Sequence, residues 1–151
     1  MILLMLRSVL LAGLCVAALD AFAACVHGYL MSGATPEGVF RYVSSGWFGS
    51  DAAKLPGAAW WGLFFHILIA IGWTGLCYLI YPFAIKAQLN PIVFGLIYGA
   101  LVWVGMNFVV LPMSNVPHFS IRWSRAWVMI LIHLFVIGVP ISLFCHRFYR
   151  Q

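Results

Sequence analysis

The chain has 151 residues, of which 65% are hydrophobic and only 7% carry a charged side chain. An ordinary soluble domain has roughly 25% charged residues, so the composition excludes a soluble fold and makes lipid the solvent for most of the chain. The net charge of +5 comes from Lys and Arg residues scattered at the ends of apolar segments. That distribution suits anchors in lipid headgroups and argues against nucleic acid as a partner.

The first apolar segment, about 2–31, begins like a secretory signal, and Ala21-Phe22-Ala23 resembles a cleavage site. The apolar stretch is longer than the roughly 7–15 residues of a signal core, and Asp20 interrupts it. We therefore expect a retained transmembrane helix.

A polar connection follows the first segment. In it, Thr35-Pro36-Glu37 is a helix start, with a hydroxyl cap, a proline in the first turn and an acid near the positive helix end. Aromatic and aliphatic residues alternate with Arg41 and two serines after this start. The pattern predicts a short amphipathic helix, about 36–46, that lies in the headgroup region.

Three further segments are long enough to cross a hydrocarbon core of ~30 Å at ~1.5 Å per residue. They cover about 57–85, 91–113 and 125–144. A polar loop, 114–124, precedes the last one, in which Pro140 after Gly138 predicts a kink. The fold class is therefore an all-α membrane protein, a single integral membrane domain over 1–151 with four transmembrane helices.

Short motifs recur at constant offsets. Ala59, Trp60 and His66 recur 67 residues later as Ala126, Trp127 and His133, and Gly13-Leu14 recurs 82 residues later as Gly95-Leu96. The offsets predict two duplicated helical hairpins, related by an axis along the membrane normal. Chance similarity between apolar helices is the alternative interpretation.

Small residues at a spacing of four form a stripe on the first and third helices. The stripe consists of Gly13, Ala17, Ala21, Gly95 and Gly99. Small residues let helix backbones approach closely in lipid, so we expect these two helices to form the centre of the bundle. A homo-oligomer seam is the alternative.

Five polar residues fall inside the apolar segments, at depths of roughly 6 to 17 Å from the loop-side helix ends. They are Asp20, His27, His66, Asn107 and His133. Intramembrane ionisable groups are costly and mark functional sites by default. If their helix faces point inward, these residues form one polar pocket beneath the outer loops.

Three interpretations of this pocket remain open. The side chains could hydrogen-bond one another and hold the bundle together. They could form a proton or small-solute path, with Asp20 as the protonatable group and the imidazoles as relays. As a third possibility, His66 and His133 could be paired ligands of a haem or a metal, although we predict no cofactor. No nucleophile–base pair is present, so we expect no enzyme activity.

The four cysteines have no metal-type spacing and are typical of buried small apolar residues.

The chain resembles a group of small bacterial inner-membrane proteins, the YagU-like proteins. The resemblance rests on several short motifs. They are Gly13-Leu14 through Asp20, Trp47-Phe48-Gly49, Gly62-Leu63-Phe64-Phe65-His66, Gly95-Leu96-Ile97-Tyr98-Gly99, Met106-Asn107, Leu111-Pro112-Met113-Ser114, and His133 with Gly138-Val139-Pro140-Ile141. The resemblance implies a polytopic protein of the bacterial inner membrane. The family has no established biochemical role, so it provides no catalytic residues to carry over.

We expect a small-solute or proton binding or transport-like module. The alternatives are an accessory subunit of a larger membrane complex and a haem-binding membrane protein. The Lys and Arg residues divide equally between the two sides of the membrane, so their count does not determine the orientation. We favour cytoplasmic termini, because the tight turn and the tail then lie inside. The ligand, the partner subunits and the oligomeric state are not predicted.

Overall fold

The structure, a computed structural model, describes residues 2–117, 121 and 123–150. Over these ranges the chain forms helices and no strand. Four helical stretches are long and apolar enough to cross a membrane, and they are Ile2–Ser32, Ala58–Lys86, Pro91–Met113 and Ala126–Tyr149. They confirm the predicted all-α class and the four apolar helices. Residues 118–120 and 122 of the second polar loop lie outside the described residues.

The first half of the chain contains two long helices and a short one. The elements are α1 (Ile2–Ser32), α2 (Pro36–Phe48), the 3-10 turn η1 (Gly49–Ala53) and α3 (Ala58–Lys86). As predicted, α2 begins at a capping hydroxyl, because the backbone N–H of Gly38 donates to Oγ1 of Thr35 at 3.2 Å. The helix continues to Phe48, two residues beyond the predicted end, and Gly49 stops it with a φ of 60°.

The second half of the chain forms two long helices, and a π-helical segment interrupts each of them. The third consists of α4 (Pro91–Gly105), the π-helical η2 (Met106–Val110) and α5 (Leu111–Met113). The fourth consists of α6 (Trp123–Leu131), the π-helical η3 (Ile132–Gly138) and α7 (Val139–Tyr149).

A proline follows each π-helical segment. Pro112 comes two residues after η2 ends, and Pro140 comes two residues after η3 ends. Proline lacks an N–H, and its ring clashes with the carbonyl four residues earlier. A wider turn before the proline accommodates both effects. Where the sequence predicted a kink in the last helix, the structure has a π-helical segment before Pro140.

The fourth helix ends at Tyr149 and not at the predicted residue 144. Its last turn is fixed to α3, because the hydroxyl of Tyr149 donates to the carbonyl of Tyr78 at 2.8 Å. The hydroxyl of Tyr81 lies 3.0 Å from Nδ1 of His146. The basic residues of this turn also suit the negative end of a helix. These contacts explain why the polar tail continues the helix.

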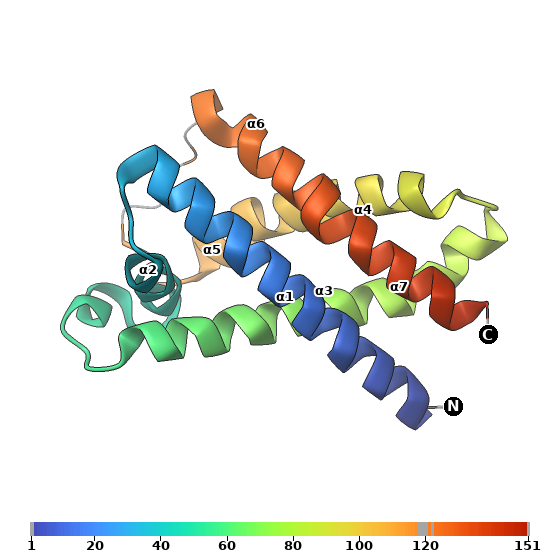
Figure 1. Cartoon of the computed structure of the whole chain (residues 1–151), viewed down its shortest axis with the longest axis horizontal. Helices are drawn as coiled ribbons and strands as arrows, with labels where there is room; N and C mark the ends of the chain where they lie inside the picture. The colour runs from blue at the N-terminus through green and yellow to red at the C-terminus, as the bar shows by residue number, and fades with distance from the viewer. Residues whose placement is uncertain (1, 118–120, 122, 151) are drawn as a thin grey trace.

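The helices form two packed pairs, α1 with α3 and α4 with the fourth helix. Both chain termini lie at one end of the bundle and α2 lies at the other (Figure 1). Gly13 of α1 packs against Ile71 of α3, whereas Gly95 and Gly99 of α4 pack against the fourth helix, at Val139 and Leu134. The small residues therefore bring each helix to its hairpin neighbour. The expectation that the first and third helices form the centre together is corrected, because their small faces serve two different pairs.

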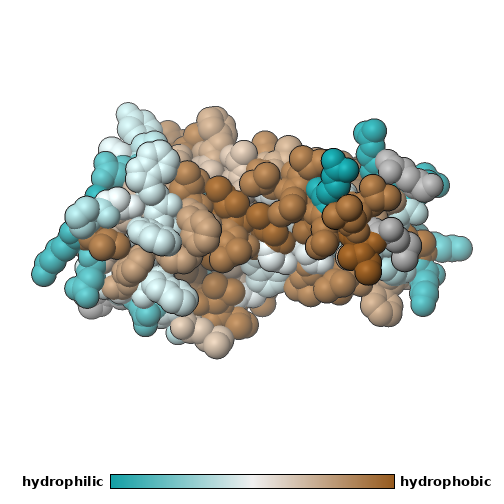
Figure 2. Space-filling model, turned by 90° about the horizontal axis from the view of Figure 1, so that it is seen from below, coloured by the Kyte–Doolittle hydropathy of each residue, from teal (hydrophilic) through white to brown (hydrophobic). Residues whose placement is uncertain are grey.

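On the face that Figure 2 shows, apolar side chains cover most of the middle of the bundle and polar side chains gather toward its two ends. Large apolar side chains such as Phe22, Leu79 and Phe135 are more than half exposed. Such a surface is stable against lipid and not against water. Inside, the half near the termini is tightly packed around Tyr78, Tyr98 and Ile141. The half beneath α2 contains a cavity.

Candidate functional site

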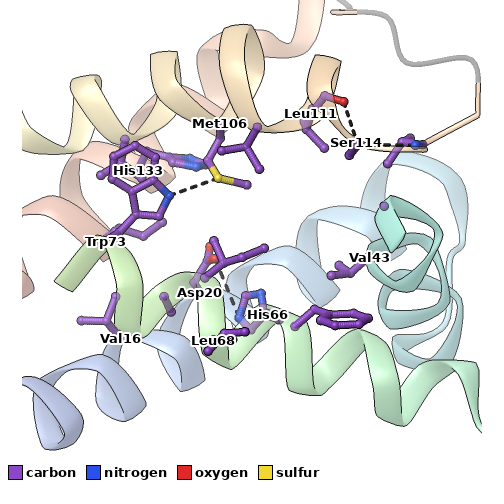
Figure 3. Close-up of a pocket in the computed structure, with 18 of the residues that line it drawn as sticks. Val16, Asp20, Val43, His66, Leu68, Trp73, Met106, Leu111, Ser114 and His133 are labelled. Carbon is purple, nitrogen blue, oxygen red and sulfur yellow. Dashed lines mark hydrogen bonds and ion pairs between the residues drawn. The ribbon is translucent and has the colours of Figure 1, made fainter. Parts of the chain in front are cut away.

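A cavity of about 380 Å³ lies beneath α2, between the two helix pairs. Its walls come from α2, from all four transmembrane helices and from the loop residues Ser114 and Val116, and most of its lining side chains are apolar. The polar exceptions on the transmembrane helices are Asp20, His66 and His133 (Figure 3). Three of the five polar residues predicted from the sequence therefore meet at one cavity.

Asp20 of α1 and His66 of α3 form the polar wall on one side. Nε2 of His66 lies 3.0 Å from the carbonyl oxygen of Ala17 and 3.9 Å from Oδ2 of Asp20. Because a carbonyl oxygen only accepts, Nε2 of His66 carries a proton and donates it to Ala17. The rings of Phe40 and His66 pack edge to face, with their centroids 6.0 Å apart. The His66 side chain is thus held in place from both α1 and α2.

His133 reaches the cavity from the π-helical η3 on the opposite side. It is 8% exposed, and its Nδ1 lies 2.8 Å from the carbonyl oxygen of Met129. By the same argument Nδ1 is the donor, which leaves Nε2 without a proton in the neutral ring. π-Helical turns are rare and are frequent at functional sites.

His27 and Asn107 do not line this cavity. Nδ2 of Asn107 donates to the carbonyl of Trp103, one turn earlier in its own helix, at 2.9 Å. Nε2 of His27 is buried, and it has no hydrogen-bond partner among the described residues. The prediction that all five polar residues form one pocket is therefore wrong for these two. Depth along a helix does not determine which face a residue occupies.

The helix α2 closes the cavity on the loop side. Tyr42, Val43, Gly46 and Trp47 contribute to the lining. Burial raises the pKa of Tyr42, so its phenol is neutral at physiological pH. The hydroxyls of Ser44 and Ser45 bond to carbonyls within the helix itself. The hydroxyl of Ser44, for example, donates to the carbonyl of Arg41 at 2.8 Å.

Two contacts fix α2 in this position. Residues from α2 and α3 form an aromatic cluster in which the rings of Trp47 and Phe65 stack at 5.8 Å. From the other hairpin, Asn115 donates its backbone N–H to Gly46 at 2.9 Å and its side-chain amide to Trp47 at 3.0 Å. The helix α2, which forms the cover of the cavity, is therefore held in place by residues from both halves of the chain.

The sequence analysis did not name Trp73, and it named Met106 only within the motif Met106-Asn107, not as a site residue. The indole N–H of Trp73 donates to Sδ of Met106 at 3.2 Å, and both side chains line the cavity (Figure 3). Gly105 leaves room for the ring, because a Cβ at this position would lie 2.5 Å from Trp73. One signal was available: Trp73 is in the middle of its helix, whereas membrane tryptophans concentrate at the interfaces.

The described residues contain no group of three His, Cys, Asp or Glu side chains that could hold a metal ion. The backbone hydrogen bonds occupy one nitrogen of each cavity imidazole and leave Nδ1 of His66 and Nε2 of His133. A haem or metal held by these two residues stays an alternative interpretation.

We compared the chain with protein-family models, with curated proteins and with solved structures, and none of them matches it. The resemblance to the YagU-like proteins therefore stays a prediction as well, and the site itself has to support any function.

Proposed function

We propose that this protein binds a small, largely apolar molecule with one polar group in the cavity beneath α2. The observation that carries the proposal is the combination of an apolar cavity with Asp20, His66 and His133 inside a membrane helix bundle. Ligand pockets in proteins have volumes of roughly 300–1,000 Å³, mostly apolar walls and a few polar groups that fix orientation. A cavity of about 380 Å³ has this character.

The two hairpins contribute related positions to the cavity, which supports the proposed duplication. His66 and His133 are 67 residues apart, as are Ala70 and Ile137, and all four line the cavity. Asp20 corresponds to Val102 at the other offset, 82, and both again line it. The cavity is thus built from two similar halves, of which only the first supplies a carboxylate.

We propose further that the protein resides in the bacterial inner membrane with both termini inside and with α2 in the outer headgroup region. The termini share one end of the bundle (Figure 1), as four spans require. The side chains of Trp47 and Trp60 are exposed at the opposite end and suit an interfacial belt. Labelling an engineered cysteine after Arg150 tests the orientation, and reaction with an impermeant external reagent would reverse it.

The binding proposal is tested with 4-tert-butylphenol, which has an apolar body and one hydroxyl group. We expect saturable binding to the purified chain in lipid nanodiscs, measured by ligand-observed NMR. Ala70→Phe adds a ring at the cavity wall and should abolish binding. Ala18→Phe adds the same ring at an exposed position of α1 and should leave binding unchanged. Equal binding by both variants, or no saturable binding to the wild-type chain, contradicts the proposal.

A further inference from the structure

The cavity has a single carboxylate and no basic counterpart. Among the described lining residues Asp20 is the only acid, and none is Lys or Arg. Its Oδ2 lies 3.9 Å from Nε2 of His66, beyond the 2.7–3.2 Å of an ordinary N–H···O hydrogen bond. The proton on that nitrogen already goes to Ala17. The Asp20 carboxyl therefore points into the cavity without a close hydrogen-bond partner among the described residues (Figure 3).

The ionised Asp20 carboxylate requires one compensating positive charge. With Asp20 ionised and both imidazoles neutral, the site has a charge of −1 in a medium where an uncompensated charge is costly. One proton, held by Asp20 or by His66, makes the site neutral. A monovalent cation in the cavity does the same. The cation and the proton are thus alternatives for one negative charge.

The aromatic walls of the cavity suit an organic cation. Tyr42, Trp47, Phe65 and Trp73 all line the cavity. Aromatic faces attract ammonium groups within about 6 Å of the ring centroid, most strongly where water is excluded. The hydrogen bond from Trp73 to Met106 fixes the orientation of that indole. A quaternary or protonated amine that carries apolar groups would therefore meet both a carboxylate and aromatic faces.

We infer that the ligand is a lipophilic monovalent cation, and that its binding releases one proton from the Asp20–His66 pair. This inference rests on the proposed ligand-binding function and specifies its ligand class. No bond other than that to the released proton changes. The same exchange gives the protein a means of coupling cation binding to a proton gradient.

The ionisable groups that face the cavity come from four elements. They are Asp20 of α1, Tyr42 of α2, His66 of α3 and His133 of η3. The third helix contributes Val102, Met106, Val110 and Leu111 and no ionisable group. The pH dependence of cation binding should therefore follow Asp20 and His66, with His133 as the second imidazole among the described lining residues.

A matched ligand pair tests the inference. The probe 4-hydroxyphenyltrimethylammonium has the shape of 4-tert-butylphenol and one positive charge in addition. At about pH 7, where the phenol of the cationic probe keeps its proton, we expect the cation to bind wild-type protein about tenfold more tightly than the neutral probe, or better. If one proton is exchanged, the apparent Kd of the cation should rise by up to about tenfold for each unit by which the pH falls below the range in which the Asp20–His66 pair titrates. Below that range, calorimetry in two buffers of different ionisation enthalpy should show about one proton released for each cation bound.

Asp20→Asn supplies the decisive control. We expect this variant to bind the two probes with similar affinity and to release no proton, while a circular-dichroism melting curve like that of the wild type shows that it is folded. If both probes bind the wild type equally, or if Asp20→Asn keeps the preference, the cation inference is overturned while the binding function stands. If neither probe binds in a saturable manner, both proposals are overturned.

Discussion

Gly62 of α3 lies directly beneath the carbonyl group of Phe40 in α2, so closely that a Cβ at position 62 would overlap the carbonyl oxygen. No other residue type fits without moving one of the two backbones. This contact lets α2 lie across the bundle, where Tyr42 and Val43 reach the cavity. The close approach of two helices therefore determines whether the cavity has a cover.

Gly62→Ala should displace α2. The new methyl group meets backbone and not a flexible side-chain end, so we expect a loss of about 1–3 kcal/mol in unfolding free energy, the usual range for overpacking. Gly72→Ala in the same helix is the matched control. A Cβ at this position meets nothing within 4 Å, and the substitution should be neutral or stabilising by up to about 1 kcal/mol. Unfolding in mixed detergent micelles measures both, and equal effects would argue against this packing of α2.

Asn115→Ala should loosen the cover without unfolding the bundle. The variant loses the side-chain hydrogen bond to Trp47 and keeps the backbone bond to Gly46. A single hydrogen bond contributes about 0.5–1.5 kcal/mol, so hydrogen exchange at the end of α2 should accelerate by roughly three- to tenfold, while exchange in α3 stays the same. Uniform acceleration across both helices would contradict the assignment of this bond to the cover.

Cys77 and Cys145 should form a disulfide when the protein is oxidised in membranes. Their Sγ atoms lie 3.5 Å apart across α3 and α7, and both side chains are fully buried. Each thiol loses a proton and an electron to an added oxidant such as copper phenanthroline. Cleavage in the loop between the third and fourth helices should then leave two fragments joined until a reductant is added. Fragments that separate without reductant would show that α3 and α7 do not pack as described.

His133→Phe tests whether the second imidazole acts as a ligand contact. The substitution keeps an aromatic ring in η3 but removes the donor to Met129 and the nitrogen left for a ligand. We expect weaker binding of 4-tert-butylphenol, with little change in the preference for the cation, which depends on Asp20. A lost cation preference with unchanged neutral binding would give His133 the charge-sensing role instead.

The four helices were predictable to within a few residues, because apolar length and turn residues determine them directly. Thr35 could also be identified as the cap of α2, because a hydroxyl cap followed by Pro36 depends only on residues that are neighbours in the sequence. The extension of the last helix to Tyr149 was not predictable. It depends on hydrogen bonds to Tyr78 and Tyr81, far away in the sequence.

The site was predictable in part. Asp20, His66 and His133 stood out because ionisable residues inside a membrane are rare. Their meeting at one cavity, and the exclusion of Asn107, depend on which face each helix presents. The π-helical η2 and η3 also change the helix phase ahead of Pro112 and Pro140. A constant rise and rotation along an α-helix cannot reproduce such changes.

The cavity as a ligand site is tested most directly by X-ray diffraction from crystals soaked in 4-bromophenol. The bromine atom can be located by its anomalous signal without prior assumptions about where it binds. We predict a bromine peak inside the cavity, between the Asp20–His66 pair and Trp73, and no such peak in Ala70→Phe crystals. Bromine found only on the lipid-facing surface, or a cavity peak that persists in Ala70→Phe, would contradict the account.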